Sequence, residues 1–281
     1  MCASLGEHLK RWAMQLQTSS DSPRLDAEIL LKHATGLSDV RLITQHNEPL
    51  DDASIAKIEA LIKKRRQGQP IAHLTGQREF YSLLLKINNQ VLIPRPETEL
   101  LVDAALERIS RLASPRILDL GTGSGAVSLA IARQAPHARI LATDRKESAL
   151  QVARENARAH RMHSVRFALS DWFRQLQPGD RFDLIVSNPP YIDPEDPHLE
   201  QGDVRFEPRS ALVAGEHGLA DIRAIIEGAP GHLERKGYLL LEHGCNQGAE
   251  VRYLLDKGGF TNTTTLQDLN RLDRVSLAQK P

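Results

Sequence analysis

Residues 187–191, Ser-Asn-Pro-Pro-Tyr, bring a side-chain amide, two prolines and a phenol together directly after the apolar run 182–186. Proline has no N–H for a β-ladder and holds the preceding residue in an extended conformation, so the prolines end a strand at this point. In open α/β sheets, ligands bind outside the carboxyl ends of the strands. Asn188 therefore stands at a position typical of ligand sites, beside a bend that Pro189 and Pro190 make rigid, and the rest of the chain decides whether this is a site.

A glycine-rich turn follows an earlier apolar run, residues 116–120. Its members are Gly121, Thr122, Gly123, Ser124 and Gly125. Glycine lets the backbone approach a ligand closely and adopt positive φ. The spacing is G-x-G-x-G rather than the G-x-G-x-x-G of dinucleotide-binding sites, which disfavours a nicotinamide-dependent dehydrogenase. Asp119, directly before the turn, would repel a pyrophosphate but suits the ammonium group of an amino-acid moiety.

Acidic residues follow the next two apolar runs. Asp144 lies about twenty residues after the glycine turn, the position from which a carboxylate holds both hydroxyls of a ribose. Asp171 is able to accept a hydrogen bond from an adenine amine, and Trp172 offers a flat face to the ring. Each acid alone is equally explained as a helix cap, and Trp172 as a core residue. The glycine turn and the two acids together lie at the ends of three successive runs, and this joint occurrence predicts a cofactor site that contains a nucleoside.

Alternating strand-like and helical patterns surround these residues from Pro115 onward. The strand-like runs are 116–120, 138–144, 165–171, 182–187 and 237–244. Short apolar strands separated by helices indicate a parallel sheet covered on both faces, so the predicted fold class is α/β. Residues 260–279 contain two more strand-like runs and no helical pattern, which predicts an antiparallel hairpin at the end of the sheet.

The first third of the chain is predicted to be helical. An Asp21/Ser22 cap precedes Pro23 at the first position of a helix that Gly36 closes. A second helix has the basic residues 63–66 at its end, where the helix dipole favours cations. We interpret this basic run as a solvated helix end. Docking onto an acidic or RNA-bearing partner is the alternative interpretation.

Two short strand-like runs around Asn88 and Asn89 predict a β-hairpin between the two parts of the chain. The predicted organisation is a helical domain over residues 1–78, a hairpin linker over 79–95 and an α/β domain over 96–281.

Composition is that of an ordinary globular protein: 281 residues, a formal net charge of zero and a pI near 7.2. With no net charge, the protein as a whole does not attract nucleic acid or an anionic membrane electrostatically. The opening residues lack the apolar core of a signal peptide and no apolar run approaches the ~18 residues of a membrane span, so a cytoplasmic location is expected. Cys2 and Cys245 form neither a disulfide framework nor a metal spacing, and no metal site is predicted.

Together these features resemble the Rossmann-like class I S-adenosylmethionine-dependent methyltransferases, and Asn-Pro-Pro-Tyr is similar to those that methylate planar nitrogens. Six segments are similar to the family that methylates the glutamine side chain in peptide chain release factors. They are IPRPETE at 93–99, LDLGTGSGA at 118–126, SDWF at 170–173, VSNPPYI at 186–192, DPHLEQGDVRFEP at 196–208 and LLLEHG at 239–244.

This resemblance implies a mostly parallel seven-stranded sheet and a small N-terminal helical domain that recognises the substrate. It implies S-adenosylmethionine as the cofactor. The residues that it assigns to cofactor binding are Gly121, Thr122, Gly123, Ser124, Gly125, Asp144, Asp171, Trp172 and Asn188. It also implies that Asn188, Pro189 and Tyr191 are catalytic. Asn188 and the carbonyl of Pro189 accept the two N–H bonds of the glutamine amide in the Gly-Gly-Gln motif of the release factor, and Tyr191 packs on the flat amide and helps to exclude water. Pro190 belongs to the same substrate site.

One segment departs from the pattern of the family. Asn270 and Arg271 stand where the family usually carries a glycine before its arginine, so no role is assigned to Arg274. Two other functions are weighed: methylation of the exocyclic amine of adenine in nucleic acid, which requires a flipped base, and a non-catalytic module that binds S-adenosylmethionine. The chain is expected to act as a monomer without stable nucleic-acid binding, and the sequence does not show which release factor it prefers.

Overall fold

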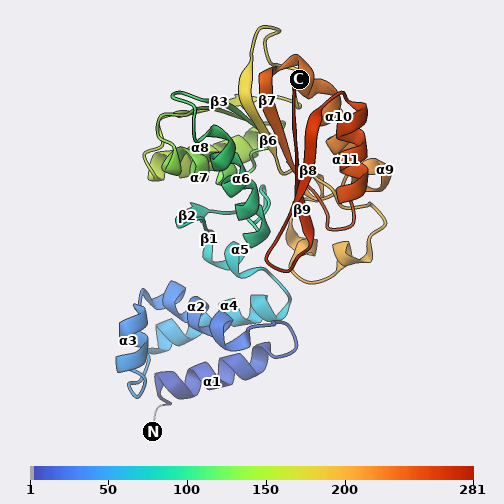
Figure 1. The fold of residues 1–281 in the computed structure, drawn as a ribbon. Coiled ribbons are helices and arrows are strands. Elements are labelled where there is room, and N and C mark those ends of the chain that lie inside the picture. Colours follow the sequence, from blue (N-terminus) through green and yellow to red (C-terminus); the bar gives the residue numbers. More distant parts are fainter. Residues whose placement is uncertain (1–2) are drawn as a thin grey trace. The chain divides into compact units, whose positions relative to one another are not determined.

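The computed structural model describes residues 3–281, so Cys2 lies outside the described residues. The chain forms two compact units (Figure 1). One comprises Met1–Gln77 with Pro197–Phe206, and the other comprises Arg78–Asp196 with Glu207–Pro281. This division differs from the predicted domains in two respects: the hairpin region belongs to the second unit, and a ten-residue segment late in the sequence belongs to the first.

The N-terminal unit is helical. Its helices are α1 (Leu5–Leu16), α2 (Pro23–Thr35), α3 (Asp39–Thr44), α4 (Asp52–Arg66) and α5 (Ile71–Thr75), with the 3₁₀ turns η2 (Pro197–Glu200) and η3 (Val204–Phe206). Ser4 and Glu7 form a reciprocal capping box at α1, and Gly36 ends α2 in the left-handed conformation. Pro23 begins α2 as expected, but Ser22 makes no side-chain cap bond; its hydroxyl donates to Asp26 instead.

The basic end of α4 is only partly solvated. Lys63, Lys64 and Arg66 are exposed, whereas Arg65 is buried. The guanidinium of Arg65 contacts the carboxylates of Asp26 and Asp203, each at 2.7 Å. Arg65 falls on the buried face of the helix that Ile58 and Ile62 define, seven and three residues earlier. The interpretation of the whole run as a solvated end was therefore wrong for Arg65.

Replacing Arg65 with alanine is expected to lower the free energy of unfolding of the N-terminal unit by about 3–5 kcal/mol, because it leaves Asp26 as an uncompensated buried charge. Urea unfolding followed by Trp12 fluorescence, with Trp172 replaced by phenylalanine, reports on this unit. Arg24→Ala is the matched control, since it removes an exposed arginine from a helical pair with Glu28 and should cost at most about 0.5 kcal/mol. Equal effects of the two substitutions would contradict the buried-charge argument.

The second unit starts with a β-hairpin formed by β1 (Gln77–Phe80) and β2 (Leu83–Lys86). Its turn is at Tyr81 and Ser82, which both have positive φ, so the predicted turn at Asn88 and Asn89 was wrong. The side chain of Glu99 accepts from the Tyr81 N–H at 2.9 Å, and that of Glu79 accepts from the Ser82 N–H at 2.6 Å. These carboxylates stabilise a turn whose residues carry none of the usual Asn-Gly signal.

The remaining strands form one seven-stranded sheet in the order β5-β4-β3-β6-β7-β9-β8 (Figure 1). Their bounds are β3 (Arg116–Leu120), β4 (Arg139–Asp144), β5 (Val165–Leu169), β6 (Phe182–Ser187), β7 (Leu233–Glu242), β8 (Thr261–Gln267) and β9 (Asp273–Gln279). β3 to β7 are parallel and β9 is antiparallel to both neighbours, as predicted. The chain runs outward from β3 to β5 and then returns to β6 on the other side of β3, which creates a switch point where ligands bind in such sheets.

Helices flank this sheet. They are α6 (Glu99–Ile109), α7 (Ala126–Gln134), α8 (Glu147–Ala159), α9 (Gly215–Gly218), α10 (Ala220–Gly228) and α11 (Gly248–Lys257), with short 3₁₀ turns η1 (Pro96–Thr98), η4 (Arg209–Ala211) and η5 (Ala229–Gly231). No helix among residues 3–281 has the length and hydropathy to span a membrane.

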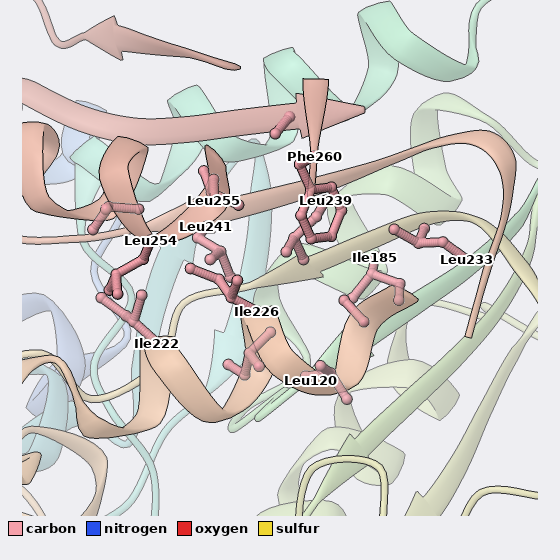
Figure 2. Packing of buried hydrophobic residues seen from close by; sticks show 14 of the residues in the cluster. Leu120, Ile185, Ile222, Ile226, Leu233, Leu239, Leu241, Leu254, Leu255 and Phe260 are labelled. Carbon is pink, nitrogen blue, oxygen red and sulfur yellow. The ribbon is translucent and has the colours of Figure 1, made fainter. Parts of the chain in front are cut away.

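Figure 2 shows how α10 and α11 pack on β6 and β7. The labelled side chains are Leu120, Ile185, Ile222, Ile226, Leu233, Leu239, Leu241, Leu254, Leu255 and Phe260. All are fully or almost fully buried. Because a close-packed core resists displacement, the carboxyl ends of β3, β6 and β7 are held in fixed positions relative to one another.

Candidate active site

The register of the sheet brings the predicted residues into one row. Leu120 pairs with Thr143 and with Ser187, so the residues that follow them, Gly121, Asp144 and Asn188, leave three adjacent strands at the same level. The hydroxyl of Ser187 donates to the Leu120 carbonyl at 2.7 Å and ties two of these ends together.

A cleft of about 950 Å³, which includes space open to solvent, lies at this edge. The predicted residues that line it are Gly121, Thr122, Gly123, Ser124, Asp144, Asp171, Trp172, Asn188 and Pro190. Gly125, Pro189 and Tyr191 are not among the lining residues. Asp119 also lines the cleft, as do residues that the sequence did not single out, including Gln90, Thr98, Lys146, Ser210 and Ala211.

The glycine turn is open toward the cleft at its centre. A Cβ added at Gly123, where φ is +55°, would meet no atom within 4 Å. At Gly125, by contrast, it would lie 3.3 Å from the Cβ of Ala153 and 3.2 Å from Leu129. Gly123 therefore leaves the backbone free for a ligand, and Gly125 permits close packing at the start of α7.

Asp144 holds the glycine turn in place. One carboxylate oxygen accepts from the N–H of Gly123 at 3.0 Å and the other from the N–H of Lys146 at 2.9 Å. Burial raises the pKa of Asp144. Because each carboxylate oxygen has more than one acceptor position, Asp144 is still able to bind donors of a ligand.

Asp119 stabilises the glycine turn through a hydrogen bond to its Thr122 side chain. Its carboxylate accepts from the hydroxyl of Thr122 at 2.6 Å and from that of Ser128. Burial raises the pKa of Asp119 to about 6. Asp119 therefore has a structural contact to the turn in addition to its position on the cleft.

The indole ring of Trp172 lines the cleft, and a hydrogen bond holds it in place. Its indole N–H donates to Asp221 at 3.3 Å, and its ring lies 3.4 Å from the place of a Cβ at Gly121. The neighbouring Asp171 is paired with the exposed Arg174 at 3.0 Å. A Cβ at position 121 would be in ordinary van der Waals contact with the indole, and the φ of +71° at this position favours glycine.

Hydrogen bonds hold both ends of the Asn-Pro-Pro-Tyr segment. The N–H groups of Tyr191 and Ile192 donate to the Leu212 carbonyl, and the Tyr191 carbonyl accepts from the Gln247 side chain at 3.0 Å. The side-chain amide of Asn188 donates through Nδ2 to Thr98 Oγ1 at 3.1 Å. That bond leaves Oδ1 as the end of the amide that does not contact Thr98.

Thr98 reaches the cleft because a buried ion pair fixes the segment that carries it. Glu207 is buried; its carboxylate pairs with Arg95 and accepts from the Ile93 N–H at 2.9 Å. The IPRPETE and FEP segments, more than a hundred residues apart in the sequence, are therefore in direct contact. Sequence reasoning quoted both segments but did not identify Thr98, since an isolated threonine carries no recognisable spacing.

Among the described residues, no cluster of histidine, cysteine, aspartate or glutamate side chains is arranged to hold a metal ion.

Known proteins and family models match nearly the whole length of this chain. Residues 7–76 match the family described as the PrmC N-terminal domain, and residues 96–202 match the methyltransferase small domain. The release factor glutamine methyltransferase of Burkholderia pseudomallei is 50% identical over 274 residues, which is 96% of each chain. The protein of that name from Escherichia coli is 46% identical, over 97% of this chain and 98% of its own. A methyltransferase structure from Pyrococcus furiosus, 17% identical, covers 79% of this chain and 97% of its own with a TM-score of 0.52, which shows a shared fold.

Proposed function

Because the chain belongs to the family of release factor glutamine methyltransferases, we propose that it transfers a methyl group from S-adenosylmethionine to the side-chain amide nitrogen of the Gly-Gly-Gln glutamine in a peptide chain release factor. The observation that supports this most directly is the position of Asn188, which directly follows β6 and lines the cleft. We expect the protein to act in the cytoplasm as a monomer without stable nucleic-acid binding.

The chemistry of the cleft fits S-adenosylmethionine. The open backbone at Gly123, the carboxylate of Asp144 and the fixed indole of Trp172 suit an amino-acid moiety, a ribose and an adenine respectively. When bound, this cofactor supplies a methyl group already activated by a positively charged sulfur. Residues 121–124, Asp144, Asp171 and Trp172 would hold it.

The task of the protein is then to orient a poor nucleophile. An amide nitrogen shares its lone pair with the carbonyl, so its lone pair must be turned toward the methyl group. Asn188 Oδ1 and the Pro189 carbonyl accept the two N–H bonds of the substrate amide, and the prolines keep that carbonyl rigid. An amide nitrogen that gains a methyl group while it still carries both protons is a cation, which is strongly acidic and loses one proton without a dedicated base to give the neutral N-methyl amide.

We infer that the N-terminal unit contributes to selection of the substrate. A folded protein is recognised through contacts beyond a single side chain. The match of residues 7–76 to a domain characteristic of this family supports that role.

Asp144→Ala is expected to weaken binding of S-adenosylmethionine by roughly 10- to 150-fold, since a hydrogen bond to a charged group is worth about 1.5–3 kcal/mol. Asp144→Asn keeps an acceptor oxygen and should lose less. Isothermal calorimetry measures the affinity. The control is Asp183→Ala, because Asp183 also accepts from a backbone N–H, that of Arg116, and does not line the cleft. Unchanged affinity in folded Asp144→Ala would remove this residue from the cofactor site.

A further inference from the structure

A buried carboxyl group, Glu242, lies one strand away from Asn188. Ser187 pairs with Leu241, so Asn188 and Glu242, the next residue of each chain segment, are at the same level of the sheet. Glu242 is 1% exposed, and its Oε1 accepts from the Tyr191 hydroxyl at 3.4 Å. Within residues 3–281, its Oε2 has no hydrogen-bond partner. A buried carboxyl with so few donors is costly to the fold and requires an explanation other than stability.

Thr98 connects this carboxyl group to the amide of Asn188. Its hydroxyl oxygen accepts from Asn188 Nδ2 at 3.1 Å, and the same side chain lowers the pKa of the Glu242 carboxyl, as a hydroxyl that faces this group does. A hydroxyl group has a single proton to donate. While that proton is directed at Glu242, Thr98 is only an acceptor for Asn188, so the Nδ2 end of the amide must face it.

We propose that Glu242, acting through Thr98, is a positioning residue that fixes the orientation of the Asn188 amide and thereby presents Oδ1 to the N–H bonds of the substrate. This inference rests on the proposed function and adds two residues to it. The Glu242 side chain is 1% exposed, so its effect passes through the amide of Asn188 rather than through contact with substrate. In the opposite orientation Asn188 would offer N–H groups to a substrate nitrogen that itself carries N–H groups, and the acceptor would be lost.

The proposal predicts a dependence on the protonation of Glu242. Burial raises the pKa of Glu242 to about 7. The other charged or titratable groups that face it are Glu97 of η1, Tyr191 after β6 and Arg274 of β9. When ionised, Glu242 only accepts; when protonated, it is able to donate to Thr98, which frees the Thr98 proton for Asn188 Oδ1. Methyl transfer should therefore be at its maximum well above pH 7, reach half of that maximum near pH 7 and fall further at lower pH.

Steady-state kinetics of the full chain with an intact release factor test the connection. Thr98→Val removes the acceptor with little change in shape and should lower kcat about 10- to 100-fold, because a misplaced catalytic group typically costs up to about 100-fold. The Kd for S-adenosylmethionine should stay within about twofold, and Thr98→Ser, which restores the hydroxyl, should recover most of the rate. Ser276→Ala is the control: it removes a buried hydroxyl on β9 that contacts His243 and Thr265, and its kcat should be unchanged. A wild-type kcat in folded Thr98→Val would overturn the proposal.

The orientation itself is measurable without turnover. In ¹H–¹⁵N spectra, the side-chain amide signals of Asn188, assigned through Asn188→Ala, should titrate with a midpoint near pH 7, and Glu242→Gln should abolish this titration. The acid limb of kcat should disappear in the same variant. If the Asn188 signals are independent of pH in the wild type, or still titrate in Glu242→Gln, the proposal is wrong. Absence of methyl transfer by the wild type would instead refute the proposed function and leave this titration as a separate test.

Discussion

Asn188→Ala should lower kcat for methyl transfer by about 10²–10³-fold while the affinity for S-adenosylmethionine stays within a few fold of wild type. The lost Oδ1 accepts an N–H of the substrate amide, and without it the lone pair of the nitrogen is no longer held toward the methyl group. Labelled methyl incorporation into a release factor measures the rate, and calorimetry measures the affinity. The two measurements separate orientation of the substrate from binding of the cofactor.

Two further variants, Asn188→Asp and Asn262→Ala, make this test more specific. Asn188→Asp keeps an acceptor but adds a negative charge, so we expect partial activity at most. Asn262→Ala removes a side-chain amide that donates to Gln279 at 2.9 Å on the edge strand β8 and should have no effect on kcat. A full-rate Asn188→Ala enzyme would refute the proposed mechanism.

The largest expected effect comes from the substrate. Replacing the glutamine of the Gly-Gly-Gln motif with glutamate removes both N–H donors and the nucleophilic nitrogen, so methyl incorporation should fall to background. The release factor retains its fold and its remaining surface, which makes this change a direct test of the target atom.

An intact factor should also be a better acceptor than a short peptide with the same motif, because the N-terminal unit is inferred to contribute contacts.

Label that persists in the glutamate variant would show that another group is methylated. Unmethylated DNA and RNA serve as controls, since a pocket for adenine requires space for a flipped purine and a basic surface for its phosphates. Incorporation into nucleic acid would favour the adenine methyltransferase instead. Cofactor binding without transfer to any acceptor would favour the non-catalytic module.

The parallel sheet was predictable from local patterns. Short apolar runs separated by helical stretches determine a covered parallel sheet, and all five predicted parallel strands and the final antiparallel pair are confirmed. The hairpin turn was not predictable, because Tyr81 and Ser82 adopt positive φ through bonds to the side chains of Glu79 and Glu99. One of these partners is eighteen residues away, outside any local turn signal.

The candidate site was predictable where it depends on strand ends and unpredictable where it depends on long-range contacts. Gly121, Asp144 and Asn188 each follow an apolar run, and the register places them together. Thr98 reaches Asn188 only through tertiary structure, and nothing in its sequence spacing relates the two residues. Glu242 lies at the end of a predicted strand, but its burial without a partner for Oε2 depends on side chains from distant segments. Arg65 illustrates the same limit, since its partner Asp203 lies 138 residues away.

Mapping of the transferred methyl group tests the central claim most directly. The purified protein is incubated with an intact release factor and S-adenosylmethionine labelled in the methyl group, and the factor is then digested and analysed by tandem mass spectrometry. The account predicts one labelled methyl on the side-chain nitrogen of the Gly-Gly-Gln glutamine and none elsewhere. Label on a different residue, or a release factor that remains unlabelled while the protein binds the cofactor, would contradict it.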